Sequence, residues 1–573
     1  MSIAALPVPR ATPASAGRGL GRAARRPEVA GAALVVLAVA AAAGAFGHAY
    51  VADDYFIILH NDRVHHLSQA WRLFAQTYWP PANSEALYRP LTTLVFAVTW
   101  AAGGGAPWLF HLVSVLLYAA VVLAVWRLAC RILPAGPAWI AAALFAAHPV
   151  HVDAVANAVG QAELWVALWC LVAMILFLDW RRTHRALTGR QVATIAGVYA
   201  LACLSKEHGI VLPGLLAVTE LTLIDDDGGW ATRLAGLGRL FLALALVACA
   251  YLLMRESVIG SWAGDYPTWA FAHASAATRG WTMLGAVPDV LRLLLWPTRL
   301  AVEYGPQEVP IRVRPDLTLV GPALVLVGAA GAGVRLRRRA PVVTFGVAWL
   351  AVTLLPTSNL LFPTGIVLAE RTLFLPSVGV VMIGGAVAAW ASAALADEPR
   401  RWRRAAAAVL VLLLLAGITR AERREREWRT DAELAWHRVQ DAPLDYLNHY
   451  SYGHLLIANG YLADGEREMQ LAMALFPGDP QPFAELGEAY AAAHRCPPAM
   501  PLFRHALDLL PKHPTARLGL ARCLLEGGDY AAARSQARIG LSYPYEREAF
   551  RQVEHAADSA LRVAGHPGGG RAG

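Results

Sequence analysis

Apolar segments of membrane length, separated by short clusters of arginine, dominate residues 31–420 of this chain. Hydrophobic residues make up 57% of the 573 residues and charged residues 16%, and the mean hydropathy is +0.42. A helix needs about 20 mainly apolar residues to cross a bilayer. Because lipid offers no hydrogen bonds to the backbone, such segments must satisfy their N–H and C=O groups internally, as helices do. The sequence therefore predicts an all-α, polytopic membrane domain.

Eleven apolar segments are predicted to cross the membrane. They cover residues 31–50, 108–126, 137–147, 164–180, 191–204, 210–224, 234–254, 317–334, 342–355, 373–390 and 405–418. When 91–100 and 281–296 are counted as interfacial helices, the arginine clusters all fall on one side, which the positive-inside rule makes cytoplasmic. The arginine-rich residues 1–30 then form the cytoplasmic start of an uncleaved signal anchor, and the chain after residue 420 lies outside the cytoplasm.

Residues 421–573 differ from the rest, because they are charged, rich in alanine and free of membrane-length apolar runs. Within them the tetratricopeptide pattern recurs with a period of 34 residues. Its best-matched unit carries Phe483, Leu486, Gly487, Tyr490, Ala499, Phe503, Ala506 and Pro511. We predict an α-solenoid of about three repeats over 446–547, between a stiff helical connector 421–445 and a cap with a disordered tail 548–573. Such a surface indicates binding without naming the ligand, so a plain spacer role stays open.

The cysteines and the net charge exclude some classes of site. None of the six cysteines forms a C-x-x-C motif, so no zinc site is predicted, and only the last two, Cys496 and Cys523, are candidates for a disulfide. The net charge of +8 does not indicate nucleic-acid binding, because the arginines lie in clusters between apolar segments. Lysine occurs only at positions 206 and 512, which draws attention to Lys206 near the membrane.

Two adjacent carboxylates, Asp53 and Asp54, follow the first apolar segment. Paired acids at a bilayer surface suit an enzyme with a lipid-linked substrate, since one carboxylate can serve as general base. Its neighbour and the low-dielectric surroundings would raise its pKa. Acidic residues are also common where a membrane helix ends at the outer surface, without any catalytic role. That alternative remains open for Asp53 and Asp54.

Further polar residues mark the predicted outer loops. His148, His151, Asp153 and Glu163 follow the third span, Lys206 and Glu207 join the fifth and sixth spans, and Arg371 precedes the tenth. Ionisable groups at membrane depth are expensive, so their presence on one side suggests a polar cavity that opens outward. The histidines are either satisfied helix-end residues or, with Asp153, ligands of a divalent metal. Lys206 is either half of an ion pair or a phosphate contact.

Together these residues resemble the transmembrane and tetratricopeptide-repeat O-mannosyltransferases, members of the GT-C class of polytopic glycosyltransferases. The matching motifs are Asp53-Asp54, Asn61-Asp62, Tyr88-Arg89-Pro90-Leu91, Phe110-His111-Leu112-Val113, Leu144-Phe145-Ala146-Ala147-His148-Pro149-Val150-His151, Gln161-Ala162-Glu163-Leu164, Ser205-Lys206-Glu207, Leu294-Leu295-Trp296-Pro297, Ser358-Asn359-Leu360 and Ala369-Glu370-Arg371. They keep the family's order from residue 53 to the repeats. Gln161 and Asp153 depart from it, since the family commonly has arginine and glutamate there.

The resemblance implies a catalytic pair, Asp53 and Asp54, and outer loops that frame a sugar phosphate. The candidates for binding the donor are Arg89, His148, His151, Glu163, Lys206, Glu207 and Arg371. It implies an enzyme that moves a sugar, mannose first, from a polyprenyl-phosphate carrier to a hydroxyl of a protein acceptor held by the repeats. We expect a bacterial member in the cytoplasmic membrane, with lipid contacts and no nucleic acid. No cofactor is assigned, and a divalent cation stays open.

Two other functions remain. The chain could be a membrane-anchored tetratricopeptide-repeat scaffold whose acidic loop has lost activity. It could instead transport a lipid-linked intermediate, although the membrane part has no internal duplication and no matching pair of broken spans.

The orientation argument generates a testable topology. Cysteine introduced at Asp464 should react with an impermeant thiol reagent added outside intact cells, whereas cysteine at Thr183 should not, because arginine-rich loops stay inside. The parent chain treated in the same way gives the background from native cysteines. Protection of position 464 would place the repeats in the cytoplasm and contradict the odd number of spans.

Overall fold

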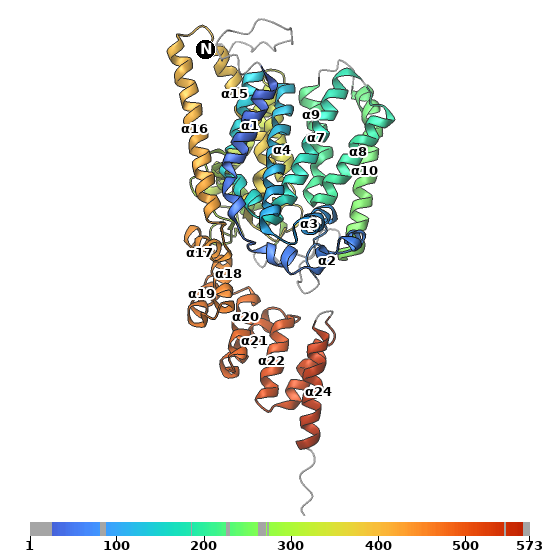
Figure 1. The fold of residues 1–573 in the computed structure, drawn as a ribbon, viewed down its shortest axis with the longest axis vertical. Coiled ribbons are helices and arrows are strands. Elements are labelled where there is room, and N and C mark those ends of the chain that lie inside the picture. Colours follow the sequence, from blue (N-terminus) through green and yellow to red (C-terminus); the bar gives the residue numbers. More distant parts are fainter. Residues whose placement is uncertain are drawn as a thin grey trace, which may run out of the picture. The chain divides into compact units, whose positions relative to one another are not determined.

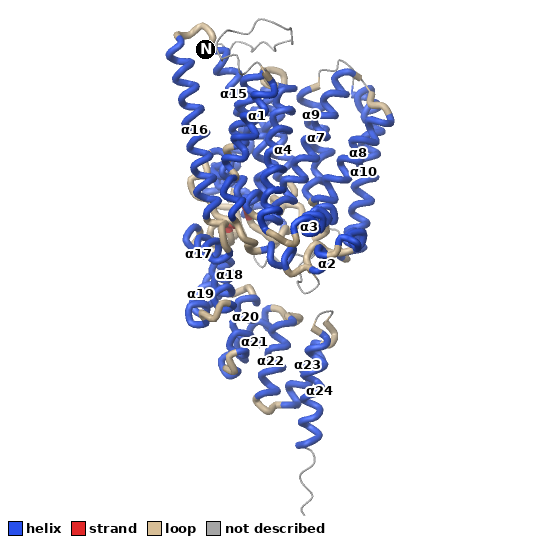
Figure 2. The backbone as a smooth tube through the Cα atoms, viewed as in Figure 1, coloured by secondary structure: helices blue, strands red, loops and turns tan. Residues whose placement is uncertain are grey.

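The computed structural model describes residues 26–80, 87–184, 186–224, 230–261, 271, 274–543 and 546–564, and nearly all regular structure in these ranges is helical (Figures 1 and 2). The predicted all-α fold class is thus confirmed. The chain divides into two compact units, one made of Met1–Glu303 and Val309–Leu434 and the other of Tyr304–Glu308 and Ala435–Gly573. The predicted cytoplasmic arginines before residue 26 and the tail after residue 564 lie outside the described residues.

The helices of the first unit coincide with the apolar segments. They are α1 (Pro27–Ala41), α2 (Asp62–His65), α3 (Pro90–Gly103), α4 (Pro107–Ile132), α5 (Ala135–Ala146), α6 (Val152–Ala156), α7 (Gln161–Thr183), α8 (Gly189–Ser205), α9 (Leu212–Leu223), α10 (Trp230–Ile259), α11 (Ala276–Gly285), α12 (Val287–Leu295), α13 (Val320–Leu336), α14 (Pro341–Leu354), α15 (Phe374–Ala394) and α16 (Arg400–Arg426). Two short strands, β1 (Glu303–Tyr304) and β2 (Leu368–Ala369), and several short 3-10 helical turns lie between these helices. Each segment predicted to span the membrane lies on one of these helices and its adjoining turns.

The length and composition of the helices make this a multi-pass membrane protein. Among the described residues, six helices are long and apolar enough to cross a membrane, and a pair bent by 50°, Ala135–Ala146 with Pro149–Ala156, gives a seventh. Helices α1 and α14 are shorter apolar helices, as is α3. The predicted count of eleven therefore stays a prediction for α1, α8, α9 and α14. In Figure 1, α2 and α3 lie at the lower end of the bundle.

Local sequence rules set several helix starts in this unit. Proline occupies the first turn of α1, α3, α4 and α14, where its missing N–H would have had no helical partner. Helix α8 begins with a capping box: Thr188 Oγ1 accepts from the Gln191 N–H at 3.3 Å, and Gln191 Oε1 accepts from the Thr188 N–H at 2.9 Å. These starts fix where the helices emerge into the loops that carry polar residues.

Small residues let α14 and α15 pack closely. A Cβ atom added at Gly346 would lie 2.6 Å from the carbonyl oxygen of Gly379, so only glycine fits at this crossing. Close packing of this kind drives helix association in lipid, where the hydrophobic effect does not. The indole N–H of Trp349 adds a hydrogen bond of 2.9 Å to the carbonyl of Leu375. Helix α14 thereby fixes the start of α15, next to the turn that carries Arg371.

The second unit is a stack of helix pairs. Its helices are α17 (Asp431–Asp441), which begins in the first unit, α18 (Tyr446–Ala458), α19 (Leu462–Leu475), α20 (Pro480–Ala492), α21 (Cys496–Leu509), α22 (Pro514–Glu526), α23 (Tyr530–Gly540) and α24 (Arg547–Ala564). The ring of Phe503 fills the space between neighbouring pairs, as the large positions of the repeat pattern predict. A disulfide joins Cys496 on α21 to Cys523 on α22, the pair that the sequence singled out.

The close approach at Phe503 gives a stability prediction. A methyl group at Gly519 would lie 2.2 Å from the Phe503 ring, so Gly519→Ala should destabilise the repeats by about 1–3 kcal/mol through overpacking. Hydrogen exchange of the α22 amides in the purified protein measures this loss. Gly478→Ala is the matched control, because its methyl would meet Phe476 only at 3.6 Å. Equal exchange in the two variants would contradict the tight packing of α22.

Candidate active site

The two adjacent acids occupy different environments. Asp54 is fully buried and accepts backbone N–H groups from Val51 at 3.3 Å, Ala158 at 3.3 Å and Val159 at 2.9 Å. Burial raises the pKa of its carboxyl to about 7, although the three N–H donors act in the opposite direction. Asp53, one residue earlier, is partly exposed. Asp54 thus ties the segment after α1 to the turn before α7, and Asp53 is left at the surface of the site.

Arg371 lies among acidic side chains from distant parts of the first unit. Its Nη2 donates to Glu303 Oε1 at 2.7 Å, and its backbone N–H donates to Asp153 Oδ2 at 3.0 Å. Asp153 is also 3.8 Å from Nη1, and Asp53 interacts electrostatically with the same guanidinium. Arg371 and Asp53, two predicted site residues, therefore lie within electrostatic range of each other.

A second group of predicted residues forms around Arg89, which precedes α3. Its guanidinium makes a two-pronged contact with Glu207, from Nε to Oε2 at 2.9 Å and from Nη2 to Oε1 at 2.6 Å. Burial alone would raise the pKa of Glu207, but the Arg89 charge outweighs it and holds that pKa well below its usual range. Arg89 also lies over the ring of Tyr78, 5.1 Å from the centroid. The charges of both Arg89 and Asp53 act on the hydroxyl of Tyr78. Tyr78 is therefore within electrostatic range of this group and of the acid pair.

The neighbouring residue Lys206 is paired as well. Its ammonium donates to Glu163 Oε1, and both side chains are almost completely buried. Burial is the largest influence on the pKa of Lys206 and lowers it, with Arg89 acting in the same direction. We call Arg89, Glu163, Lys206 and Glu207 the charged quartet. It holds two cations and two anions on α3, α7 and the loop between α8 and α9.

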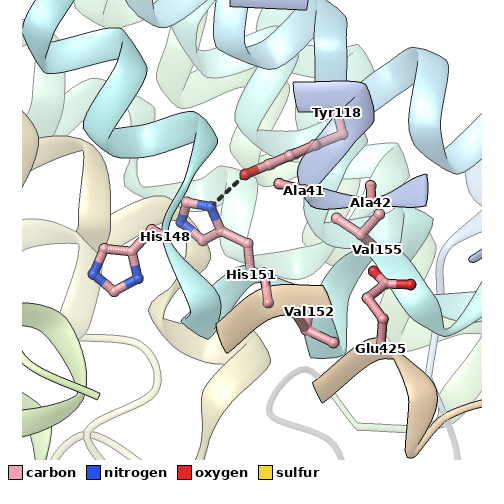
Figure 3. A pocket seen from close by; sticks show the side chains of 9 residues that line it. Ala41, Ala42, Tyr118, His148, His151, Val152, Val155 and Glu425 are labelled. Atoms are coloured by element: carbon pink, nitrogen blue, oxygen red, sulfur yellow. Dashed lines mark hydrogen bonds between the residues drawn. The ribbon is translucent and has the colours of Figure 1, made fainter. Parts of the chain in front are cut away.

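The predicted histidines are committed to structural hydrogen bonds. His151 pairs through Nδ1 with the Tyr118 hydroxyl at 3.0 Å and through Nε2 with Ser377 Oγ at 2.9 Å. His148 Nε2 pairs with the carbonyl of Leu294 at 3.0 Å. Figure 3 shows the Tyr118 contact and the small pocket that these rings line with Glu425. In the described part of the chain no three side chains of the ligating types are arranged to hold a metal ion. The two rings therefore help to hold the loop, and their contact with the donor stays a prediction.

Two residues of the site escaped the sequence reasoning. Glu303 follows the predicted interfacial helix 281–296 and has no neighbouring motif, yet it binds Arg371. Tyr78 lies in a short loop and is buried beside Arg89. An isolated acid in an otherwise aliphatic stretch was the one available signal for Glu303. No local pattern marks Tyr78, because its partner Arg89 lies eleven residues further along the chain and only the folded connection brings the two side chains together.

Comparisons with known proteins support the resemblance stated above. Residues 498–538 match the family model described as Tetratricopeptide repeat. The Mus musculus Protein O-mannosyl-transferase TMTC3 is 28% identical over 370 residues, which are 58% of this chain and 39% of the relative. The Caenorhabditis elegans Protein O-mannosyl-transferase F38B6.6 is 26% identical over 457 residues, 78% of this chain and 62% of the relative. This chain thus spans less than two thirds of the length of either relative.

A solved structure is a weaker match. The crystal structure of the Archaeoglobus fulgidus oligosaccharyltransferase tethered to an acceptor peptide gives a TM-score of 0.39 at 13% identity, over 77% of this chain and 59% of that one.

The fold and the site define a polytopic helical membrane protein with a tetratricopeptide-repeat unit and a charged, loop-built centre. The chain is a homologue of proteins named protein O-mannosyl-transferases, from mouse, nematode and fly, which confirms the resemblance that the motifs indicated.

The buried Lys206–Glu163 pair generates a prediction. Glu163→Gln should destabilise the membrane unit by about 3 kcal/mol, because it leaves an uncompensated ammonium in the interior. Adding Lys206→Met to that variant should restore most of the stability, since both charges are then gone. Thermal unfolding in detergent measures both effects. A double variant no more stable than Glu163→Gln would show that Lys206 is not balanced by Glu163.

Proposed function

We propose that this protein is an integral-membrane glycosyltransferase that moves a sugar from a polyprenyl-phosphate carrier to a hydroxyl of a protein acceptor outside the cytoplasm. The observation that carries the proposal is the cluster of Arg371 with Glu303 and Asp153, with Asp53 in electrostatic range, in the membrane unit that also holds the Arg89–Glu207 pair. A carboxylate and two guanidiniums are what a hydroxyl attack on a sugar phosphate needs. The names of the homologues make mannose the first sugar to test.

Asp53 is our candidate for the general base. The carboxylate of Asp54 is already occupied by three backbone N–H groups and is shut off from solvent, so it cannot reach an acceptor without dismantling the loop. Asp53 is partly exposed beside it and interacts electrostatically with Arg371. The two acids therefore have different roles in this proposal. Asp54 holds the segment after α1 in place, and Asp53 accepts the proton of the acceptor hydroxyl.

Phosphate would be held by cations that already have acidic partners. Arg89 and Lys206 are neutralised by Glu207 and Glu163, so neither cation is left without a counter-charge. The phosphodiester monoanion of the donor can share these donors, and the Arg89 pair is the more accessible because Glu207 is about a third exposed. Arg371, shared between Glu303 and Asp153, can take up charge as it develops on the phosphate.

The reaction then balances as a single displacement. The acceptor oxygen bonds to the anomeric carbon while the bond from that carbon to the phosphate oxygen breaks. The hydroxyl proton passes to Asp53, and polyprenyl phosphate leaves with the electron pair, its charge held by the arginines. Attack on the face opposite the phosphate inverts the anomeric centre.

The repeats are proposed to bind the acceptor polypeptide. The Cys496–Cys523 disulfide supports an extracytoplasmic location for them, because disulfides persist in oxidising compartments and are rare in the cytosol. The positive-inside count supports the same side. A cytoplasmic membrane in a bacterial cell is the location we propose.

One experiment separates the transferase from the alternatives. Purified protein is incubated with a panel of labelled polyprenyl-phosphate sugars and a hydroxyl-bearing acceptor peptide, and labelled peptide and released lipid phosphate are followed. Transfer from at least one donor supports the proposal. A protein that binds no donor would be a scaffold, and one that moves the intact donor across vesicles without cleaving it would be a transporter.

Asp53→Asn should lower transfer by about a hundredfold or more, the usual effect of removing a general base, and leave donor binding near normal. Initial rates at saturating donor measure this. Asp62→Asn is the control, since Asp62 is an exposed acid of the same segment. Asp54→Asn should lower transfer through loss of loop anchoring, with a parallel loss of stability. Near-normal turnover in both Asp53→Asn and Asp54→Asn would overturn the assignment.

A further inference from the structure

We propose that residues 425–431, from the end of α16 to the start of α17, hold the Asp53 loop in its working conformation, with Asp431 as the positioning residue. This inference rests on the proposed function, because it takes Asp53 as the group that acts on the acceptor. It assigns a role within the membrane unit to a stretch that the sequence presents only as a connector to the repeats.

The backbone at Ala52 is the first observation. Its φ angle is +47°, in the left-handed region that residues other than glycine, asparagine and aspartate rarely adopt. A residue with a Cβ atom stays there only when its surroundings hold it. Ala52 immediately precedes Asp53, so the direction of the Asp53 side chain depends on this conformation.

Asp431 supplies the holding contact. Its Oδ1 accepts the backbone N–H of Ala52 at 2.8 Å, across 379 residues of sequence. A charged acceptor makes a stronger hydrogen bond than a neutral one. The contact therefore acts on the residue of this loop whose φ angle is positive, directly before Asp53.

Other contacts of the same stretch act beside it. The N–H of Ala49 donates to the carbonyl of Arg429 at 3.0 Å. Trp428 is 1% exposed and packs in one apolar cluster with Val51. Glu425, fully buried, lies 3.7 Å from Nε2 of His48.

Two segments of the chain therefore hold this loop by hydrogen bonds. Residues 48–52 are held by 425–431, and Asp54 is held by the backbone of Ala158 and Val159. Asp53 lies between these anchors with its side chain at the surface of the site. Such positioning matters for catalysis, since a displacement of about 1 Å at a reacting group can cost about a hundredfold in rate.

The test uses the full-length protein and the interplay of residues 52 and 431. Asp431→Ala should lower kcat for transfer from the active polyprenyl-phosphate sugar by about tenfold or more, with KM for the donor near the wild-type value. Asp431→Asn keeps an oxygen acceptor and should retain most of kcat. Ala52→Gly combined with Asp431→Ala should recover most of kcat, because glycine adopts the left-handed conformation without strain. Glu433→Ala, an exposed acid on the same helix, should behave as the wild type.

A second readout does not depend on turnover. The N–H groups of Asp54 and Tyr55 close the following turn on the carbonyls of Val51 and Ala52 at 3.0 and 3.3 Å. Their hydrogen exchange should accelerate in Asp431→Ala and return toward the wild-type rate when Ala52→Gly is added. Glu433→Ala should leave it unchanged.

The outcomes are distinct. Unchanged exchange in Asp431→Ala overturns the inference, whatever the activity. A loss of kcat that Ala52→Gly fails to rescue and Asp431→Asn shares also overturns it, because the charge of Asp431 or the general fold would then be responsible. If the wild type transfers no sugar from any donor, the proposed function fails, and the exchange result still decides whether Asp431 holds the loop.

Discussion

The need to balance every charge near the bilayer governs the arrangement of this protein. Each buried cation of the charged quartet is matched with a carboxylate from a different segment: Arg89 with Glu207 and Lys206 with Glu163. An unpaired charge at this depth costs several kcal/mol, so these pairs draw α3, α7 and the loop between α8 and α9 together. The same pairing gathers Arg371, Glu303 and Asp153 near Asp53. The ion pairs of this charged site thus also connect helices to one another.

The sequence predicted the helical architecture because apolar length and a repeat period are properties of contiguous stretches. Every predicted span coincides with a helix, and the helix pair α20 and α21 carries the repeat positions read from Phe483 to Pro511. The number of spans is harder to predict, because a polar loop with Lys206 separates the short helices α8 and α9 and because α5 bends into α6. Length and composition alone do not say whether such helices cross.

The candidate site was predictable in part. The chemistry of Asp53, Arg89, Lys206 and Arg371 follows from residue type and position beside apolar segments, and the family motifs name the same residues. Their partners do not follow, since Glu303 and Tyr78 reach the site only through the fold. The different environments of Asp53 and Asp54 were equally hidden, because the anchoring of Asp54 depends on the backbone of Ala158 and Val159, about a hundred residues away. The connector 421–445 illustrates the same limit: a local charge pattern predicts a stiff helix, whereas the contacts at Ala49 and Ala52 show that its first part belongs to the membrane unit.

The pairing of Lys206 with Glu163 has a practical consequence for labelling. The sequence contains only two lysines, and the ammonium of Lys206 is buried against a carboxylate, with its pKa lowered by burial. Lys512, on the turn before α22, is exposed. Amine-directed reagents should therefore discriminate between the two lysine side chains by accessibility rather than by basicity alone. A fluorophore or a surface tether would attach to the repeat unit through Lys512, and the chemistry of the membrane site would remain untouched.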